Sequence, residues 1–153
     1  MPETHSAAGP LDLEQQVCFG LSIAARGVVA AYRPLLEPIN LTHPQYLVMV
    51  ALWQHGPRSV KELGALLMLD SGTLSPMFKR LQAMGLVRRE RGANDERQVL
   101  VSLTDKGASL RSEAEAVHEK VIERLGLSAE DLDHLHHVLG QVISATSRLA
   151  PQP

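Results

Sequence analysis

Small hydroxyl residues and basic residues share one short stretch near the middle of this 153-residue chain. The stretch supplies Ser71, Gly72, Thr73, Ser75, Pro76, Lys79 and Arg80. Hydroxyl groups can contact base edges and phosphate oxygens of DNA, and the two cations can bind its backbone. If the stretch begins a helix, the free amides of the first turn add a phosphate site. Together these side chains predict binding of double-stranded DNA.

The distribution of charge supports this prediction. Between residues 57 and 111, ten Lys or Arg stand against six Asp or Glu, a local charge of +4. The remaining five basic and eleven acidic residues bring the formal net charge of the whole chain to −2. A basic surface on an otherwise acidic body attracts a polyanion to one face only.

Two short helices are expected to position the polar stretch. Ser59 and Glu62 form a capping box, which predicts a helix that ends near Asp70. Either Asp70 or Ser71 can cap a second helix, whose apolar residues recur at three- and four-residue spacing. Gly85 is placed to end this second helix.

A basic hairpin is predicted after the second helix. The apolar pattern changes from helical to alternating over residues 86–90 and 98–103, which indicates two strands around a polar turn. Four arginines belong to this hairpin: Arg88, Arg89, Arg91 and Arg97. Two helices followed by a basic hairpin are typical of a winged helix-turn-helix. Any one of these charges alone would read as an ordinary solvated surface.

The rest of the chain is expected to be helical. The predicted helices cover residues 12–38, 42–56, 104–125 and a segment from 128 onwards, and three of them begin at capping boxes: Asp12 with Gln15, Thr42 with Gln45, and Ser128 with Asp131. The fold class is therefore mainly α with a small β-hairpin wing. The apolar width of the first and last helices exceeds what a small winged helix needs.

These helices suggest which parts of the chain bind DNA and which parts form a dimer. Residues 1–10 are expected to form a flexible N-terminus and residues 11–153 a single domain. Within it, residues 43–104 are predicted to form mainly the DNA-binding lobe, and residues 11–37 and 105–150 mainly the dimerisation helices. A homodimer would present two recognition helices to the two halves of an inverted-repeat operator.

The chain contains a single cysteine, Cys18, in the first predicted helix. A lone cysteine in an apolar helix is most often an inert small hydrophobic residue. Activation to a thiolate would need hydrogen-bond donors, for which Tyr32 is a candidate. Tyr32 follows fourteen residues later, about 21 Å along the same helix, and cannot reach Cys18 there. Two first helices packed antiparallel in a dimer would bring Tyr32 of one subunit near Cys18 of the other.

The wider sequence places limits on function. It has no secretory signal and no apolar run of membrane-spanning length, so we expect a cytoplasmic protein without membrane contact. One cysteine excludes an internal disulfide. No phosphate loop, nucleotide fingerprint or paired nucleophile and base is present, so we expect neither a cofactor nor an enzyme. A cluster of His134, His136 and His137 is interpreted as a solvated stripe, with no metal site.

Several stretches are similar to a known family: Cys18-Phe19, Tyr32-Arg33-Pro34-Leu35-Leu36, Pro44-Gln45-Tyr46-Leu47, residues 69–77 and Asp95-Glu96-Arg97. On these residues the segment 12–104 resembles the MarR family of winged-helix regulators. It resembles most closely the organic-hydroperoxide-sensing, OhrR-type branch. The resemblance covers about two thirds of the chain. The wing residues Asp95 and Arg97 alone would indicate only the wider family.

The resemblance implies a dimeric repressor whose reduced form binds an operator and whose oxidised form releases it. Cys18 would be the redox-sensing thiol, with an organic hydroperoxide as inducer. Arg97 would enter the minor groove from the wing, and Asp95 would brace it by a salt bridge. In such proteins two tyrosines donate to the sulfur; Tyr32 matches one, and His43 stands in place of the other. Without a second cysteine, the oxidised sulfur would take a small-molecule thiol as a mixed disulfide or be overoxidised.

Two other functions remain open from the residues. A repressor of the same family could be released by a small aromatic or phenolic ligand, with Cys18 merely packed. An enzyme could use Cys18 as a one-cysteine peroxidase, although the complete DNA-reading segment and the absence of a cation near Cys18 in sequence disfavour it.

Overall fold

The computed structural model describes residues 9–149, which fall into two compact units. The first unit comprises residues 9–118 and the second residues 119–149. The predicted flexible segment 1–10 lies outside the described residues except for Gly9 and Pro10, as does the chain beyond residue 149.

The first unit contains most of the secondary structure. Its elements are a 3-10 turn at Leu13–Gln15, α1 (Val17–Leu36), a 3-10 turn at Glu37–Ile39, α2 (His43–His55), β1 (Arg58–Ser59), α3 (Val60–Leu67), α4 (Ser71–Ala83), β2 (Val87–Arg91), β3 (Val99–Leu103) and α5 (Asp105–Ser109). Helix α6 (Arg111–Leu125) continues into the second unit, which also contains α7 (Ala129–Leu149). The predicted fold class, mainly α with a small β-hairpin wing, is confirmed.

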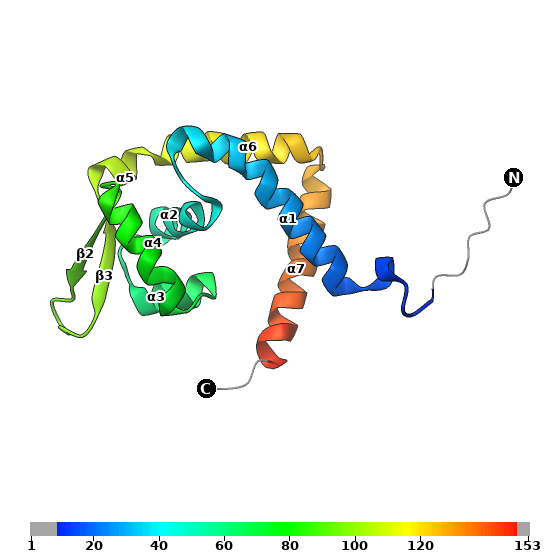
Figure 1. Cartoon of the computed structure of the whole chain (residues 1–153), viewed down its shortest axis with the longest axis horizontal. Helices are drawn as coiled ribbons and strands as arrows, with labels where there is room; N and C mark the ends of the chain where they lie inside the picture. The colour runs from blue at the N-terminus through cyan, green and yellow to red at the C-terminus, as the bar shows by residue number, and fades with distance from the viewer. Residues whose placement is uncertain (1–8, 150–153) are drawn as a thin grey trace, which may run out of the picture. The chain divides into compact units, whose positions relative to one another are not determined.

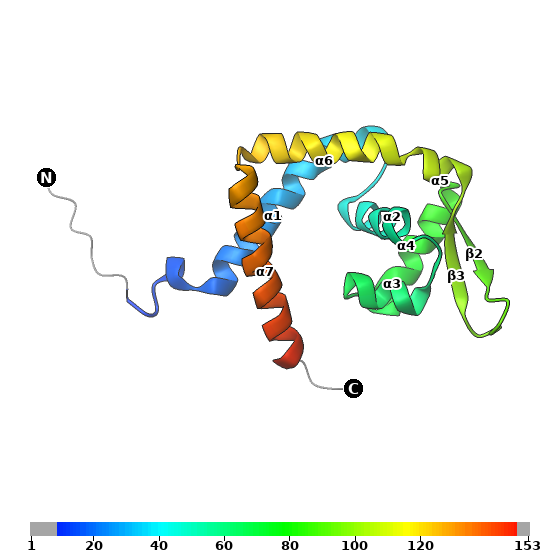
Figure 2. The same cartoon turned by 180° about the vertical axis from the view of Figure 1, so that it is seen from behind.

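Helices α2, α3 and α4 gather beside the β2–β3 hairpin (Figures 1 and 2). The hairpin is antiparallel, with Val87 opposite Leu103 and Arg91 opposite Val99. Strand β1 pairs with β3 on its other edge and completes a three-stranded sheet. Sequence patterning missed β1, because a two-residue strand is too short to show an alternation.

A compact apolar core holds the recognition helix α4 in place. Leu74, Phe78 and Leu81 on one face of α4 are fully buried, together with Leu63 of α3 and Val101 of β3. Burying side chains of this size contributes about 1.5–3 kcal/mol each relative to exposure. Because the apolar face of α4 is committed to this core, its opposite face is left for solvent or a ligand.

Local capping signals account for where several helices begin. In α2 and α3, Thr42 with Gln45 and Ser59 with Glu62 form the predicted reciprocal capping boxes. Ahead of α7, the Ser128 hydroxyl accepts the Asp131 amide at 3.1 Å and the Asp131 carboxylate accepts the Ser128 amide at 3.2 Å. These three predictions are confirmed.

Two helix predictions were wrong in detail. The Asp12 carboxylate does not cap a helix: it turns back to accept the amide of Gly9, and α1 begins only at Val17. The single helix predicted over 104–125 is interrupted at Leu110. There the carbonyl of Lys106 accepts the Ser109 hydroxyl at 2.8 Å in addition to the amide of Leu110 at 3.2 Å.

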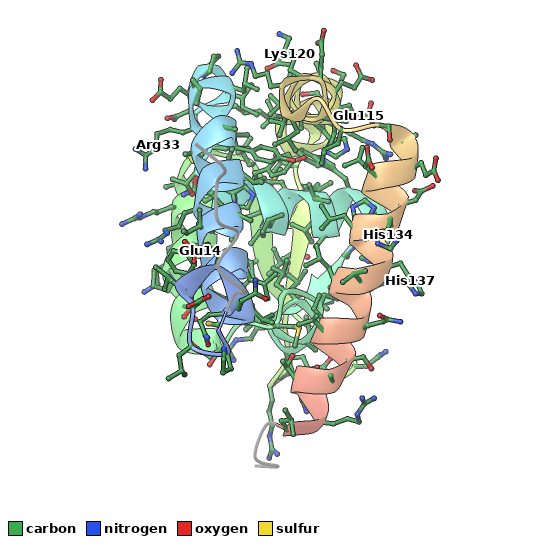
Figure 3. All side chains as sticks on the ribbon, turned by 90° about the vertical axis from the view of Figure 1, so that its right-hand side faces the viewer. Glu14, Arg33, Glu115, Lys120, His134 and His137 are labelled. Carbon is green, nitrogen blue, oxygen red and sulfur yellow. The ribbon has the colours of Figure 1, made fainter. Side chains whose placement is uncertain are left out.

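Helix α1 in the first unit and α7 in the second expose large apolar side chains. On α1 these are Val17, Leu21, Ile23 and Val29, and on α7 Leu135, Val138, Ile143 and Leu149. Figure 3 shows His134 and His137 along α7. Over residues 9–149, no three His, Cys, Asp or Glu side chains are grouped to hold a metal ion. In the same range, no helix combines the length and apolar character needed to cross a bilayer.

Candidate nucleic-acid interface and thiol site

Asp70 caps the N-terminus of α4. Its carboxylate accepts the amide of Thr73 at 2.7 Å, and this hydrogen bond lowers the pKa of Asp70. Ser71, Gly72 and Thr73 in the first turn are therefore exposed on an ordered helix end. Ser75 is half-buried, and Pro76, Lys79 and Arg80 are exposed further along the helix. The face opposite the core carries the polar set that the sequence indicated.

A groove of about 780 Å³ lies between α3, α4 and the wing. Ser71 and Ser75 of α4 line it together with Arg97 of the hairpin turn. Lys61 of α3 and Arg89 of β2 line the same groove, although neither was among the predicted binding residues. The fold thus brings hydroxyl groups from one helix and cations from three elements to a single concave surface.

Arg89 has a structural partner that explains its place in the groove. Its Nε donates to the side-chain carbonyl of Gln82 at 3.0 Å, which ties β2 to α4. The signal in the sequence was its place among the four arginines of the predicted hairpin. The structure shows that Arg89 is half-buried, whereas Arg88 and Glu90 on either side are exposed. Lys61 gave a weaker signal, as an exposed cation in the first turn of α3.

Asp95 supports the wing differently from the prediction. Its carboxylate accepts the backbone amide of Arg97 at 2.9 Å and stabilises the turn. The predicted Asp95–Arg97 salt bridge is absent; the ion pair found within residues 9–149 joins Arg111 to Glu115. Arg97 is exposed. An ion pair at the surface gains little energy against the side-chain entropy that it costs, so the absence of the Asp95–Arg97 pair costs the fold little. Arg97 is therefore available to a ligand.

Cys18 is exposed on α1 and lies on the same helix as Tyr32, which is only 8% exposed. The structure does not bring these two residues together within one chain. It does group Tyr32 with His43, whose ring centroid is 5.0 Å away, and with Tyr46 at 5.4 Å. The His43 and Tyr46 centroids are 6.1 Å apart. We call Tyr32, His43 and Tyr46 the aromatic cluster.

Two residues near Tyr32 were not predicted to belong to this site. Tyr46 was matched only as part of a stretch that resembles the family, and His118 of α6 was too isolated in the sequence to indicate a role. The Tyr32 hydroxyl lies 3.4 Å from His118 Nδ1. The two residues are 86 positions apart, so only the tertiary fold relates them.

Burial keeps the aromatic cluster uncharged. It raises the pKa of Tyr32, and burial with the neighbouring Tyr32 hydroxyl raises the pKa of Tyr46 to about 12. Burial lowers the pKa of His43, so its imidazole is neutral near pH 7. The cluster can therefore offer hydrogen-bond donors to a nearby anion but no full positive charge.

A second cleft, of about 710 Å³, lies among residues of α1, α2 and α4. Arg33 of α1 and Arg80 of α4 line it, together with the acidic Glu37 and with His43. Arg80, which we expected at the DNA surface, thus borders this cleft and not the groove beside the wing. Two guanidinium groups beside a partly apolar lining could hold a small anionic molecule.

Comparisons with known proteins agree with this architecture. Residues 30–114 match the family model described as transcriptional regulator SarA/Rot. The organic hydroperoxide resistance transcriptional regulator of Bacillus subtilis is 43% identical over 129 residues, which are 84% of this chain and 88% of that protein.

Two solved structures illustrate the likeness of fold. Reduced AbfR bound to DNA has a TM-score of 0.76 and 34% identity, over 90% of this chain and 94% of that one; AbfR comes from Staphylococcus epidermidis, and it has also been solved overoxidised on DNA. BpsR of Bordetella bronchiseptica, whose DNA binding is regulated by 6-hydroxynicotinic acid, has a TM-score of 0.79 and 26% identity over 88% of this chain and 97% of that one. With its winged helix and these matches, the chain belongs to the MarR/SarA family of winged-helix transcriptional regulators.

Proposed function

We propose that this regulator is a repressor that senses organic hydroperoxides by oxidation of Cys18 and releases its operator when oxidised. The observation that carries the proposal is the exposed, single Cys18 on an apolar helix that also bears a buried phenol, Tyr32. The similarity to the Bacillus subtilis hydroperoxide resistance regulator supports the same chemistry.

DNA binding is assigned to the groove beside the wing and to the exposed face of α4. In this assignment the first turn of α4, with Ser71, Gly72 and Thr73, meets the major groove, where hydroxyls and free amides contact bases and phosphates. Ser75 and Pro76 lie beside them, and Lys79 binds the DNA backbone. Arg80 is exposed on the same helix but lines the cleft of α1, α2 and α4, so it is not assigned to DNA. Arg97 enters the adjacent minor groove from a turn that Asp95 orders. AbfR, which shares this fold, has been solved on DNA.

A homodimer is proposed to complete both the DNA-binding surface and the sensor. The exposed apolar residues of α1 and α7 would be buried against the same helices of a second copy. If two α1 helices cross antiparallel near Ala25, midway between Cys18 and Tyr32, each cysteine meets the tyrosine of the other subunit. Gly20 and Gly27 have open space where a Cβ would lie, so they permit a close crossing.

The proposed oxidation balances without a cofactor. The Cys18 thiolate attacks one peroxide oxygen, an S–O bond forms and the O–O bond breaks, and the alkoxide leaves as an alcohol after taking a proton. Sulfur loses two electrons and the peroxide gains them. A small-molecule thiol then attacks the sulfenic acid, so that a disulfide forms and water leaves. The chain has no second cysteine to take that place.

Release follows from crowding at the helix crossing. A mixed disulfide places a bulky group where two α1 helices approach, and the displaced helices would carry the two α4 helices away from their half-site spacing. AbfR was crystallised on DNA in its overoxidised form. Operator binding should therefore be measured separately for the two oxidation products of Cys18, the mixed disulfide and the overoxidised acid. We expect the larger adduct to weaken operator binding more.

The direct test uses a duplex operator selected by this protein from random sequence. Wild type, Cys18→Ser and a control on the same helix, Ser22→Ala, are bound to it and treated with cumene hydroperoxide and a small thiol. Wild type and the control should release DNA, gain mass at Cys18 and recover with dithiothreitol, whereas Cys18→Ser should stay bound. Release of Cys18→Ser by peroxide would remove the cysteine from the mechanism.

One observation favours a second candidate function, which is release by a small aromatic acid. The cleft that Arg33 and Arg80 line could bind such an anion, and BpsR responds to 6-hydroxynicotinic acid. Titration of the DNA complex with aromatic acids separates the two functions. Release that needs no oxidant, persists in Cys18→Ser and is lost in Arg33→Ala would favour the ligand-controlled repressor.

A further inference from the structure

We propose that His118 is a positioning residue of the peroxide sensor, which holds the Tyr32 hydroxyl so that its proton points to the Cys18 thiolate of the second subunit. This inference rests on the proposed function. It starts from the one polar contact that joins α6 to the aromatic cluster, the 3.4 Å approach of the Tyr32 hydroxyl to His118 Nδ1.

The Tyr32 ring has little freedom in the folded chain. It is 8% exposed, and the rings of His43 and Tyr46 lie against it at centroid distances of 5.0 and 5.4 Å. With the ring held, the free choice is the direction of the hydroxyl proton, which rotates about the C–O bond. The groups that contact the hydroxyl oxygen therefore decide what Tyr32 can donate to.

His118 can set this direction because its Nδ1 lies 3.4 Å from the Tyr32 hydroxyl. Its residue is exposed apart from this contact, so water can satisfy the second ring nitrogen. When Nδ1 carries a proton, it donates to the Tyr32 oxygen, and the proton of Tyr32 is left for another acceptor. A hydroxyl that accepts one hydrogen bond is polarised and becomes a better donor in the next.

The same contact explains how the sensor can work with His43 at the second donor position. Burial keeps His43 neutral, so it brings no charge to the sulfur. Tyr46 is 6% exposed and holds its proton firmly, with a pKa of about 12. Tyr32 is the phenol that the proposed crossing of two α1 helices brings to the thiolate, and a hydrogen bond from the imidazole of His118 makes its hydroxyl a better donor.

The test measures the rate at which cumene hydroperoxide oxidises Cys18, followed by intact mass after rapid quenching, in His118→Ala and His118→Asn. We expect His118→Ala to slow oxidation about fivefold, the effect of one net hydrogen bond. His118→Asn offers an amide N–H near the place of Nδ1 and should restore the rate to within about twofold. His136→Ala, the same change at an exposed histidine of α7, should leave it unchanged.

A double-mutant cycle separates positioning from general damage. In a Tyr32→Phe background, His118→Ala should produce no further loss, because it acts only through the hydroxyl. Operator affinity of the reduced His118→Ala protein and its circular dichroism should match wild type. An unchanged or faster rate in His118→Ala, or an Asn variant as slow as Ala, would overturn the proposal.

The two proposals fail in different ways. The oxidation rate is read at the sulfur, whereas the repressor function is read from operator release. If Cys18 oxidises but the DNA stays bound, the proposed function fails, and the His118 proposal is still judged by the ratio of rates.

Discussion

Replacing Gly107 by alanine should loosen the junction between the recognition helix and the segment that leads into α6. A Cβ at Gly107 would lie 2.0 Å from the carbonyl oxygen of Leu86, the residue that follows the turn after α4. Real Cβ atoms essentially never approach a heavy atom closer than 3.0 Å. The two backbone segments must therefore separate by about 1 Å.

The cost of this separation can be worked out from the contacts it breaks. The Leu86 carbonyl accepts the amide of Thr104 at 3.1 Å, and the Gly107 carbonyl accepts Trp53 Nε1 at 2.9 Å. Two hydrogen bonds contribute about 2 kcal/mol, and forcing a methyl into packed surroundings costs about 1–3 kcal/mol. We expect Gly107→Ala to lower the free energy of unfolding by about 3–5 kcal/mol.

Urea unfolding at one protein concentration measures this change. Trp53 is the single tryptophan of the chain, and its indole lies at the junction, so its fluorescence can be compared with circular dichroism of the whole protein. The midpoint should fall while the slope stays constant. Ala108→Gly is the matched control, because it removes one methyl at the next, exposed position and should cost about 1 kcal/mol or less.

The reasoning is refuted if Gly107→Ala unfolds within about 0.5 kcal/mol of wild type, the range of an ordinary surface substitution. A loss equal to that of Ala108→Gly would also refute it, because helix propensity and not the clash would then account for the result.

Three further changes test other parts of the molecule. Ser59→Ala removes the oxygen that accepts the Glu62 amide at 3.1 Å and should lower stability by about 1 kcal/mol in thermal unfolding; no loss would show that the α3 cap is unimportant. Burial depresses the pKa of His43 in the folded state, so the unfolded chain binds its proton first and stability should fall as the pH drops through about 6.5. Urea midpoints at pH 7.5 and 5.5 should differ less in His43→Gln than in wild type, and an equal difference would contradict the assignment. Arg97→Ala should reduce the slope of log affinity against log salt by about one on the selected operator duplex, whereas Arg124→Ala, outside the proposed surface, should keep the wild-type slope.

Local signals predicted most of the secondary structure. The helix caps at Thr42, Ser59 and Ser128 could be predicted because each cap side chain hydrogen-bonds a residue three positions further on. Such a contact depends only on the local turn into the helix. The same rule failed at Asp12, where the amide of Gly9 competes for the carboxylate. Sequence patterning also missed β1, because its two residues are defined as a strand only by their pairing with Val101 and Leu100.

The residues proposed to face DNA could be predicted one by one from the sequence, but the surface that they form could not. Ser71, Thr73 and Arg97 stood out by residue type and order, and their neighbours in sequence supported them. That Lys61 and Arg89 join Ser71 in one groove depends on how α3 and β2 pack around α4. Residue type alone also could not show that Arg80 borders a different cleft from the other predicted DNA-binding residues.

The sequence by itself determined a mainly helical winged-helix chain with one cysteine, because helix caps, apolar periods and charge segregation act over a few residues. Only the tertiary structure decided which distant side chains meet. Tyr32 contacts His118, and Trp53 contacts Gly107, across 86 and 54 positions. Such contacts arise when buried apolar faces select one packing of the helices, and no local pattern encodes that selection.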